Sequence, residues 1–572
     1  LTDIIKEYDT AKHLGIMGLY GSSKGLLLAR LARQYVNQSF LVITPTETNA
    51  NELINDCNVF FHPNDAHRLN LFPESSTLPY SRLSPDSWEW AERIKILYKL
   101  LQNEPVVIIA PIAAVMRRLP PKKYIEMGSR IIRLKEIVDP AILSSHLTSY
   151  GYEDVSIVED EGTFTRRGGI VDLWPPTSEN PVRLEFDGDT IASMRFFDPA
   201  NQRSKGETHE VTIIPVRDFP FGIEERKIVA QKIRARAEDM DISARDWRAI
   251  TEAVNEGIAF SGIETLMPLF HDDTATIFDY LKSNASIIID ESIDADQSAT
   301  TLLKSVTTLF AETKSLERII KPEEILISWD EVNSLTSKFK QMWWNGSGIL
   351  QYAPTIVQIE SNIDLKPLIE GHKKNEDMLA PLVGKIRQWQ KKSWRVVFTC
   401  HTELQAERLI DLFKWHGVTL ARFEGTHPHI RIAKLSSGFR WPAENLVVIT
   451  DEEIFGTKVS KKTVATKPLE PFTSFAELAE GDFLVHEKHG IGRYLGLVHM
   501  AIADKANDYL LIEYLGGDKL YLPVYRLNLI GRFIGSGDGA PILDRLGGTR
   551  WLQTQQKVNT AIRIMAKELL QI

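Results

Sequence analysis

Apolar runs alternate with helical patterns over the first 121 residues of the chain. Two uninterrupted apolar runs, at residues 40–44 and 106–110, are each followed by a proline and then by a helix-like stretch. Runs without polar alternation are typical of strands that are buried on both faces of a parallel sheet. The pattern therefore predicts an α/β domain in which helices cross between neighbouring strands.

The pattern changes between residues 122 and 220, where short charged strands such as 169–174 and 182–186 are joined by glycine-rich turns. Helical periodicity then dominates residues 224–281, and an apolar strand follows at 286–292. We expect this strand to return the chain to the first sheet. The order predicts an α+β domain inserted into the first α/β domain.

A second, smaller α/β unit is predicted after the sequence NGSG at residues 345–348, which we interpret as a flexible joint. Apolar strands are expected at residues 394–400, 419–423 and 446–450, with a helix after the first of them. The unit ends at a lysine-rich stretch with few large apolar residues, which is typical of a linker.

Short alternating runs separated by glycine or aspartate follow at residues 482–486, 494–500, 509–515 and 519–522. About five short strands in so few residues predict an SH3-like or Tudor-like β-barrel. Such a barrel is too small for a catalytic cleft, and it usually binds a partner through an open edge.

The fold class is thus multidomain α/β, and the chain is divided at positions where the pattern changes. The predicted units are a first α/β domain in two parts (1–121 and 221–345), an inserted domain (122–220), a small α/β domain (349–456), a linker (457–476), a barrel (477–545) and a connecting helix (546–572). The helical pattern of the last segment runs to Ile572, which predicts that the natural protein continues.

Composition limits the function classes. The chain has 572 residues, 43% hydrophobic and 25% charged, with a formal net charge of −9. A chain that wraps DNA along its length would need a concentrated basic surface. Only Cys57 and Cys400 occur, so we expect no disulfide framework, no zinc site and a reducing cytoplasmic location. No apolar run is long enough to predict a membrane span.

A phosphate loop is expected near the N-terminus, but it lacks two of its parts. The stretch Gly18-Leu-Tyr-Gly21-Ser-Ser23-Lys24-Gly25 has serine where the second glycine should curl around phosphate, and glycine where a hydroxyl should bind Mg²⁺. The strand before Asp290 and Glu291 is similar to a Walker B strand. We interpret these carboxylates, and Asp451 to Glu453 after a later strand, as structural. No cofactor and no catalytic residue is predicted.

Four stretches of the sequence carry a resemblance to the bacterial transcription-repair coupling factor (Mfd) family. The order V-H-x-x-H-G-I-G-R-Y…E-Y…K-L-Y-L-P-V in the barrel resembles the RNA polymerase-interacting domain of that family, which CarD-type regulators share. The degenerate loop, the segment at residues 71–86 and the motif TRRGGIVDLWP at 165–175 resemble its N-terminal half, whose first module is similar to the repair protein UvrB. In that family the module has lost ATP binding.

The resemblance implies two protein partners. In the family the inserted domain binds UvrA, and the motif places that role on Arg166, Arg167 and Arg183. The barrel is expected to bind the RNA polymerase β subunit. Alternation along residues 494–500 predicts that Tyr494, Val498 and Met500 share one face, and we expect these three residues to form the polymerase contact.

The leading hypothesis is therefore a monomeric adaptor for transcription-coupled nucleotide excision repair, whose ATP-driven DNA translocase belongs to the rest of the parent protein. An alternative is an NTP-dependent repair helicase subunit of UvrB type, which would need an intact GKT loop. A free-standing CarD-like regulator would leave the first 470 or so residues unexplained. Nucleotide binding distinguishes the first two.

Overall fold

The computed structural model describes most of the chain up to residue 455 and parts of the last hundred residues. The described ranges are 2–81, 87–240, 242–258, 260, 262–313, 316–345, 354–365, 379–422, 428–455, 481–486, 489–502, 505–523, 530–532 and 543–545. The predicted linker at 457–476 and the predicted connecting helix at 546–572 lie outside these ranges.

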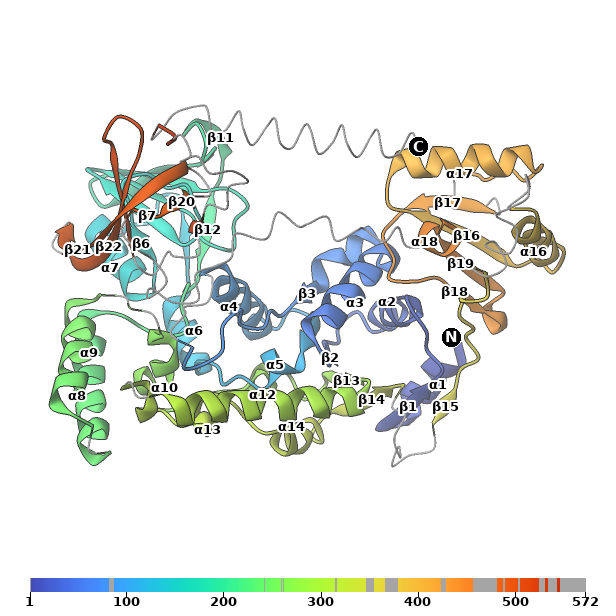
Figure 1. The fold of residues 1–572 in the computed structure, drawn as a ribbon, viewed down its shortest axis with the longest axis horizontal. Coiled ribbons are helices and arrows are strands. Elements are labelled where there is room, and N and C mark those ends of the chain that lie inside the picture. Colours follow the sequence, from blue (N-terminus) through green and yellow to red (C-terminus); the bar gives the residue numbers. More distant parts are fainter. Residues whose placement is uncertain are drawn as a thin grey trace.

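A seven-stranded parallel sheet forms the first α/β domain (Figure 1). Its order is β15 (Thr355–Ile356), β1 (His13–Met17), β14 (Lys340–Trp344), β13 (Ser286–Asp290), β2 (Phe40–Thr44), β4 (Val107–Pro111) and β3 (Leu69–Leu71). The strands predicted from the two early apolar runs are confirmed. The predicted return is also confirmed, because β13 lies between β14 and β2.

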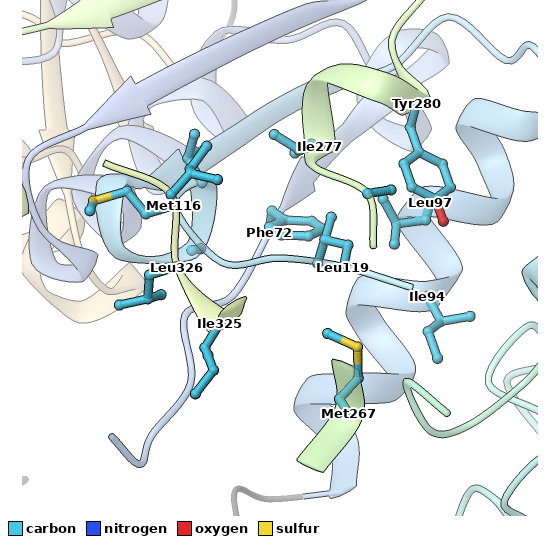
Figure 2. Close-up of a cluster of buried hydrophobic side chains, with 14 of the residues drawn as sticks. Phe72, Ile94, Leu97, Met116, Leu119, Met267, Ile277, Tyr280, Ile325 and Leu326 are labelled. Atoms are coloured by element: carbon cyan, nitrogen blue, oxygen red, sulfur yellow. The ribbon is translucent and has the colours of Figure 1, made fainter. Parts of the chain in front are cut away.

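Helices cover both faces of this sheet. They are α1 (Thr2–Thr10), α2 (Ser23–Gln34), α3 (Glu47–Phe60), η1 (Pro63–Arg68), α4 (Ser87–Leu101), α5 (Ile112–Val115), α12 (Ser292–Glu312), η3 (Leu316–Ile319), α13 (Pro322–Ile325) and α14 (Trp329–Thr336). Alternate residues of β2 enter two different buried clusters, Leu41 in one and Val42 in the other. Figure 2 shows part of the first cluster, with Phe72 and Leu119 at its centre. Burial on both faces explains why the strands are continuously apolar.

The stretch predicted as an insertion forms separate sheets. The larger has the order β11 (Ser204–Glu207), β10 (Thr190–Phe197), β9 (Val182–Asp187), β8 (Ile170–Leu173), β7 (Thr163–Arg167) and β6 (Glu153–Asp154), and the smaller pairs β12 (Glu210–Ile213) with β5 (Arg130–Arg133). Helices α6 (Lys122–Gly128) and α7 (Pro140–Ser149) accompany them. This part has its own buried cluster, which includes Phe164 and Leu184.

Helices fill the return to the first sheet, as the periodicity of residues 224–281 predicted. They are α8 (Ile223–Asp239), α9 (Ala244–Glu256), η2 (Ile263–Leu266), α10 (Met267–Phe270) and α11 (Ile277–Tyr280). Figure 1 shows α8 and α9 side by side, projecting as a pair, and the two helices make many close contacts. Within the described helices, none is long and apolar enough to cross a bilayer.

The second α/β unit contains a four-stranded sheet in the order β17 (His429–Ile432), β16 (Arg395–Cys400), β19 (Leu446–Thr450) and β18 (Phe439–Trp441). Its helices are α16 (Ala380–Lys391), α17 (Glu403–Trp415), η4 (Pro442–Glu444) and α18 (Asp451–Phe455). The strand predicted at 419–423 is wrong over its described part, which makes a single bridge between Ala421 and His429. Val418 and Leu420 are apolar because they pack into the core, and β17 joins the sheet instead.

The predicted barrel contains five antiparallel strands in the order β23 (Lys519–Pro523), β22 (Lys505–Glu513), β21 (Gly490–Ile502), β20 (Phe483–His486) and β24 (Ile530–Arg532). The four strands expected from alternation are confirmed. Strands β23 and β24 lie at the two ends of this order, and no pairing joins them within the described residues. Closure into a barrel stays a prediction.

Candidate functional site

The phosphate-loop region lies between β1 and α2, and the amides of Gly18, Leu19, Tyr20 and Ser22 donate to acceptors within the protein. Gly18 and Gly21 adopt left-handed φ values of +91° and +53°. The Asn345 side-chain oxygen accepts from the amides of Gly18 at 3.1 Å and Leu19 at 3.0 Å. The Ser23 hydroxyl accepts from the amide of Tyr20 at 3.0 Å. An incoming phosphate would have to displace these acceptors, since anion binding in such a loop depends on free amides.

A turn of the second α/β unit covers the same loop. The Ser437 carbonyl accepts from the Ser22 amide at 3.3 Å and from the Ser22 hydroxyl at 2.7 Å. A Cβ atom added at Gly21 would lie 2.1 Å from the Ser437 hydroxyl oxygen. The space above the loop is therefore filled by protein.

Gly25 occupies the position at which a working loop carries its Mg²⁺-binding hydroxyl. A Cβ atom there would lie 2.9 Å from Cβ of Asp56, so the absence of a side chain lets α2 approach α3 closely. Glycine at this position therefore allows close packing of the two helices and provides no hydroxyl for Mg²⁺. Among the described residues, no group of three or more His, Cys, Asp or Glu side chains could hold a metal ion.

Lys24 is paired inside the protein. Its Nζ lies 2.7 Å from Oδ1 of Asp290 and 3.0 Å from Oε1 of Glu291, and its side chain is only 17% exposed. Burial lowers the pKa of Lys24, but the two carboxylates outweigh burial and raise it above its ordinary value. Burial raises the pKa of Asp290 to about 6, although Lys24 opposes the shift. The lysine therefore forms an ion pair with both carboxylates that resemble a Walker B site.

Asp56 of α3 is a second buried carboxylate near the loop, and it holds the covering turn. Its two oxygens accept from the amide and the hydroxyl of Ser436, each at 2.7 Å. Burial raises the pKa of Asp56 to about 6, although these hydrogen bonds lower it.

We expect Asp56→Asn to stabilise the protein at pH 8 by about 2 to 3 kcal/mol, the equivalent of a two-unit pKa shift. The raised pKa means that the folded state binds the proton more tightly, so the contribution of Asp56 is present at low pH and lost as the pH rises through about 6. The gain should disappear near pH 4. Denaturant unfolding at both pH values checks this, and an equal effect at the two values would contradict it.

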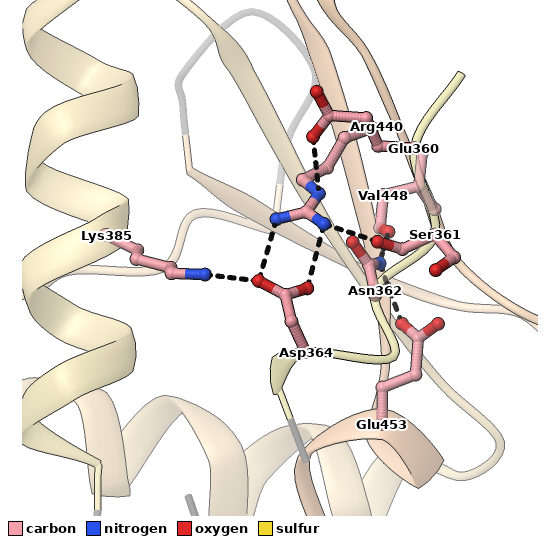
Figure 3. Close-up of polar contacts among 8 residues, drawn as sticks. All are labelled: Glu360, Ser361, Asn362, Asp364, Lys385, Arg440, Val448 and Glu453. Carbon is pink, nitrogen blue, oxygen red and sulfur yellow. Dashed lines mark hydrogen bonds and ion pairs between the residues drawn. The ribbon is translucent and has the colours of Figure 1, made fainter. Parts of the chain in front are cut away.

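The carboxylates after β19 also have structural roles, as the sequence predicted. Glu453 accepts from the amides of Gly438 at 2.9 Å and Thr450 at 3.0 Å, and from the Asn362 side chain at 2.9 Å. Asp451 lies 3.0 Å from Nδ1 of His401. Figure 3 shows Glu453 and Asn362 beside a larger network in which Arg440 contacts Asp364.

The arginines predicted to bind UvrA lie in two environments. Arg183 donates to both oxygens of Asp172, at 2.7 and 2.8 Å, and its guanidinium lies 4.9 Å from the centre of the Phe197 ring. The Asp172 hydrogen bonds raise the pKa of Arg183. Arg183 is therefore engaged within the sheet, which the sequence did not reveal.

Arg166 and Arg167 are exposed at the end of β7, beside the turn to β8. Arg167 donates to the Ser156 carbonyl. The turn has open space around Gly168, and Ile170 after it is exposed. This hairpin tip presents exposed arginines, and arginine is one of the residue types enriched in binding hot spots.

The predicted polymerase contact is divided by a β-bulge. In β21 the register shifts between Tyr494, which pairs with Ile512, and Gly496, which pairs with Leu511. One extra residue exchanges the faces of the strand, so Val498 does not share the face of Tyr494 and that prediction is wrong. Tyr494 is 5% exposed and belongs to the buried cluster of the five-stranded sheet.

Val498 lies on the other face and is half-buried. Its pairing with Tyr509 places it beside the row formed by Leu511 and Tyr521, and Tyr521 is exposed. The backbone of Met500 pairs with Asn507, and its side chain lies outside the described atoms. This apolar row of β21 to β23, in which Tyr509 is buried and Tyr521 is exposed, is thus the candidate contact surface.

Asn345, Ser437 and Asp56 are the important residues that sequence reasoning missed. The sequence predicts a flexible joint at Asn345, but its side chain is hydrogen-bonded to Gly18 and Leu19 of the loop. Of the three, only Asn345 has a residue type that points to a special backbone conformation, because asparagine readily adopts the left-handed region. The φ of Asn345 is +48°.

Family models match two parts of the chain. A UvrB interaction domain matches residues 131–219, and a CarD-like/TRCF RID domain matches residues 478–534. The first contains the six-stranded sheet and the second contains the five-stranded one.

Curated relatives match along the whole chain. The transcription-repair-coupling factor of Myxococcus xanthus is 31% identical over 595 residues, which cover 100% of this chain and 49% of the relative. The predicted resemblance to transcription-repair-coupling factors is confirmed. The factor of Bacillus subtilis is 27% identical, and the match covers 97% of this chain and 48% of the relative. The factor of Haemophilus influenzae is 28% identical, and the match covers 88% of this chain and 44% of the relative. The chain spans about half the length of the curated relatives that it matches.

Proposed function

We propose that this chain is the partner-recognition part of a transcription-coupled repair factor. In this proposal the barrel binds a stalled RNA polymerase through its β subunit, and the inserted domain recruits UvrA. The observation that carries the proposal is the presence of both matched domains on one chain. Both partners would be met in the cytoplasm, and ATP-driven movement on DNA would belong to the remainder of the full-length protein.

The chain itself is proposed to be without enzymatic activity. Asn345 accepts hydrogen bonds from loop amides that a nucleotide would need, Ser437 fills space above the loop, and charged Lys24 is already paired with Asp290. The alternative, a UvrB-type helicase subunit, requires phosphate binding at this loop. The occupied loop argues against that alternative.

The hairpin tip is proposed as the UvrA contact. We expect Arg167→Ala to weaken UvrA binding by about 1 to 3 kcal/mol, the usual range for a charge-assisted contact within an interface. Its melting temperature should remain unchanged because the side chain is exposed. Calorimetric titration with purified UvrA measures the effect.

Arg183→Ala provides the matched comparison. It should lower stability by about 1 to 3 kcal/mol, because buried Asp172 loses its partner. Any weakening of UvrA binding by Arg183→Ala would accompany this loss of stability. Normal UvrA affinity in a folded Arg167→Ala variant would contradict the assignment of the contact to the tip.

A further inference from the structure

The two α/β units are joined directly above the degenerate phosphate loop. Asp56 of the first unit accepts both hydrogen bonds of Ser436, and Ser22 donates twice to the Ser437 carbonyl. Asp56, Ser22 and Ser23 are all buried. Each unit therefore satisfies buried polar groups of the other, and separation would leave them without these partners.

Apolar packing continues the same junction. One buried cluster contains residues of both units, among them Ile16 and Leu27 from the first and Phe439 and Trp441 from the second. Trp441 is almost completely buried. The units thus share a core, whereas domains that move freely usually meet through smaller and more polar surfaces.

A segment that we call the strap, residues 355–364, completes the junction on the other side of the loop. Strand β15 pairs with β1, and a Cβ atom added at Gly18 would lie 2.1 Å from the Val357 carbonyl oxygen. The backbones of Glu360 and Arg440 then exchange two hydrogen bonds, at 2.8 and 2.9 Å. Figure 3 shows the Arg440 guanidinium between Glu360 and Asp364, which fixes the strap to the second unit.

We infer that the turn at residues 436–438 is an intramolecular substitute for nucleotide that locks the two α/β units in one orientation. A ligand moves a pair of domains only if it binds one arrangement better than the other. Here the contacts that a nucleotide would supply come from the chain itself, and the closed arrangement is permanent. The pair acts as a rigid support between the inserted domain and the barrel, and nucleotide does not alter it.

A spin-label pair tests the rigidity. Val36 and Trp415, which are 51% and 91% exposed, lie in different units and accept cysteine substitutions, while Cys57 and Cys400 are buried. We expect one narrow distance distribution between the labels, identical with and without Mg-ATP. The distribution should broaden when Asp56→Ala and Ser436→Ala are added. A broad distribution in the parent, a shift with ATP, or no change in the variant would overturn the lock.

Gly21→Ala tests the turn itself, with Gly188→Ala as its control. Both glycines have similar positive φ values, +53° and +59°, but only at Gly21 would the new Cβ meet Ser437; at Gly188 nothing lies within 4 Å. In Gly21→Ala the amides of residues 434–438 should exchange with deuterium about tenfold faster or more, which corresponds to about 1.4 kcal/mol.

The control and a second substitution complete this experiment. Exchange at 434–438 should stay at the parent rate in Gly188→Ala, and it should slow again when Ser437→Gly is added to Gly21→Ala. Should Gly21→Ala fail to fold, Ser436→Ala alone should give the faster exchange. Unchanged exchange in Gly21→Ala or Ser436→Ala, or no recovery in the double variant, would refute the role of the turn.

Discussion

Replacing Lys24 with alanine is expected to lower the free energy of unfolding by about 2 to 4 kcal/mol at pH 8. The substitution leaves Asp290 buried without the counter-ion that lies 2.7 Å away. The raised pKa of Asp290 makes its contribution present at low pH and lost as the pH rises through about 6. Without Lys24 this pKa rises further, so the loss of stability should be smaller at pH 5 than at pH 8.

Two further variants show whether the effect comes from the buried pair. Lys24→Met combined with Asp290→Asn removes both charges and should recover most of the loss. Lys6→Ala removes a lysine from an exposed pair with Asp3, and it should change stability by less than about 0.5 kcal/mol. If Lys24 were a nucleotide ligand, Lys24→Ala would leave the melting curve unchanged and abolish ATP binding in calorimetry. That result would contradict the structural role.

Val498→Arg in the barrel is expected to weaken binding to the RNA polymerase β subunit by about 2 to 4 kcal/mol. The substitution would place an unpaired charge in the apolar row of β21 to β23. The five-stranded domain should remain folded, because Val498 lies on the face opposite Tyr494 and outside the buried cluster. Titration of the purified polymerase with this chain measures the effect.

Tyr494→Ala gives the opposite pattern. Its ring belongs to the buried cluster of the five-stranded sheet, so truncation should cost about 3 kcal/mol of stability. Any loss of polymerase binding by Tyr494→Ala would then result from unfolding. Binding should be restored at a low temperature at which the variant is folded. If a folded Val498→Arg variant binds with parental affinity, the face of β21 that carries Val498 is not the contact.

The sequence predicted those elements whose pattern is local. The run FLVIT at β2 and the run LVVIT at β19 are confirmed to the residue, because strands buried on both faces are continuously apolar. That residues 18–25 form a degenerate phosphate loop stays a prediction, which rests on the defined chemical role of each missing part.

Features that depend on distant contacts could not be predicted. Ser22 and Ser437 are 415 positions apart, and no periodicity reports that they meet. The bulge in β21 exchanges the two faces of the strand, and the sequence shows no sign of it. Strict alternation therefore predicted that Tyr494 and Val498 lie on the same face. Arg183 fitted the binding motif, but its bond to Asp172 depends on the pairing of β8 with β9.

Simultaneous binding of both proposed partners is the most direct test of the account. RNA polymerase would be immobilised, purified UvrA added without nucleotide, and retention of UvrA measured with and without this chain. The account predicts that UvrA is retained only when the chain is present, that Mg-ATP makes no difference to the bridging, and that either Arg167→Ala or Val498→Arg reduces it. Failure of the folded chain to bridge the two proteins would contradict the central claim.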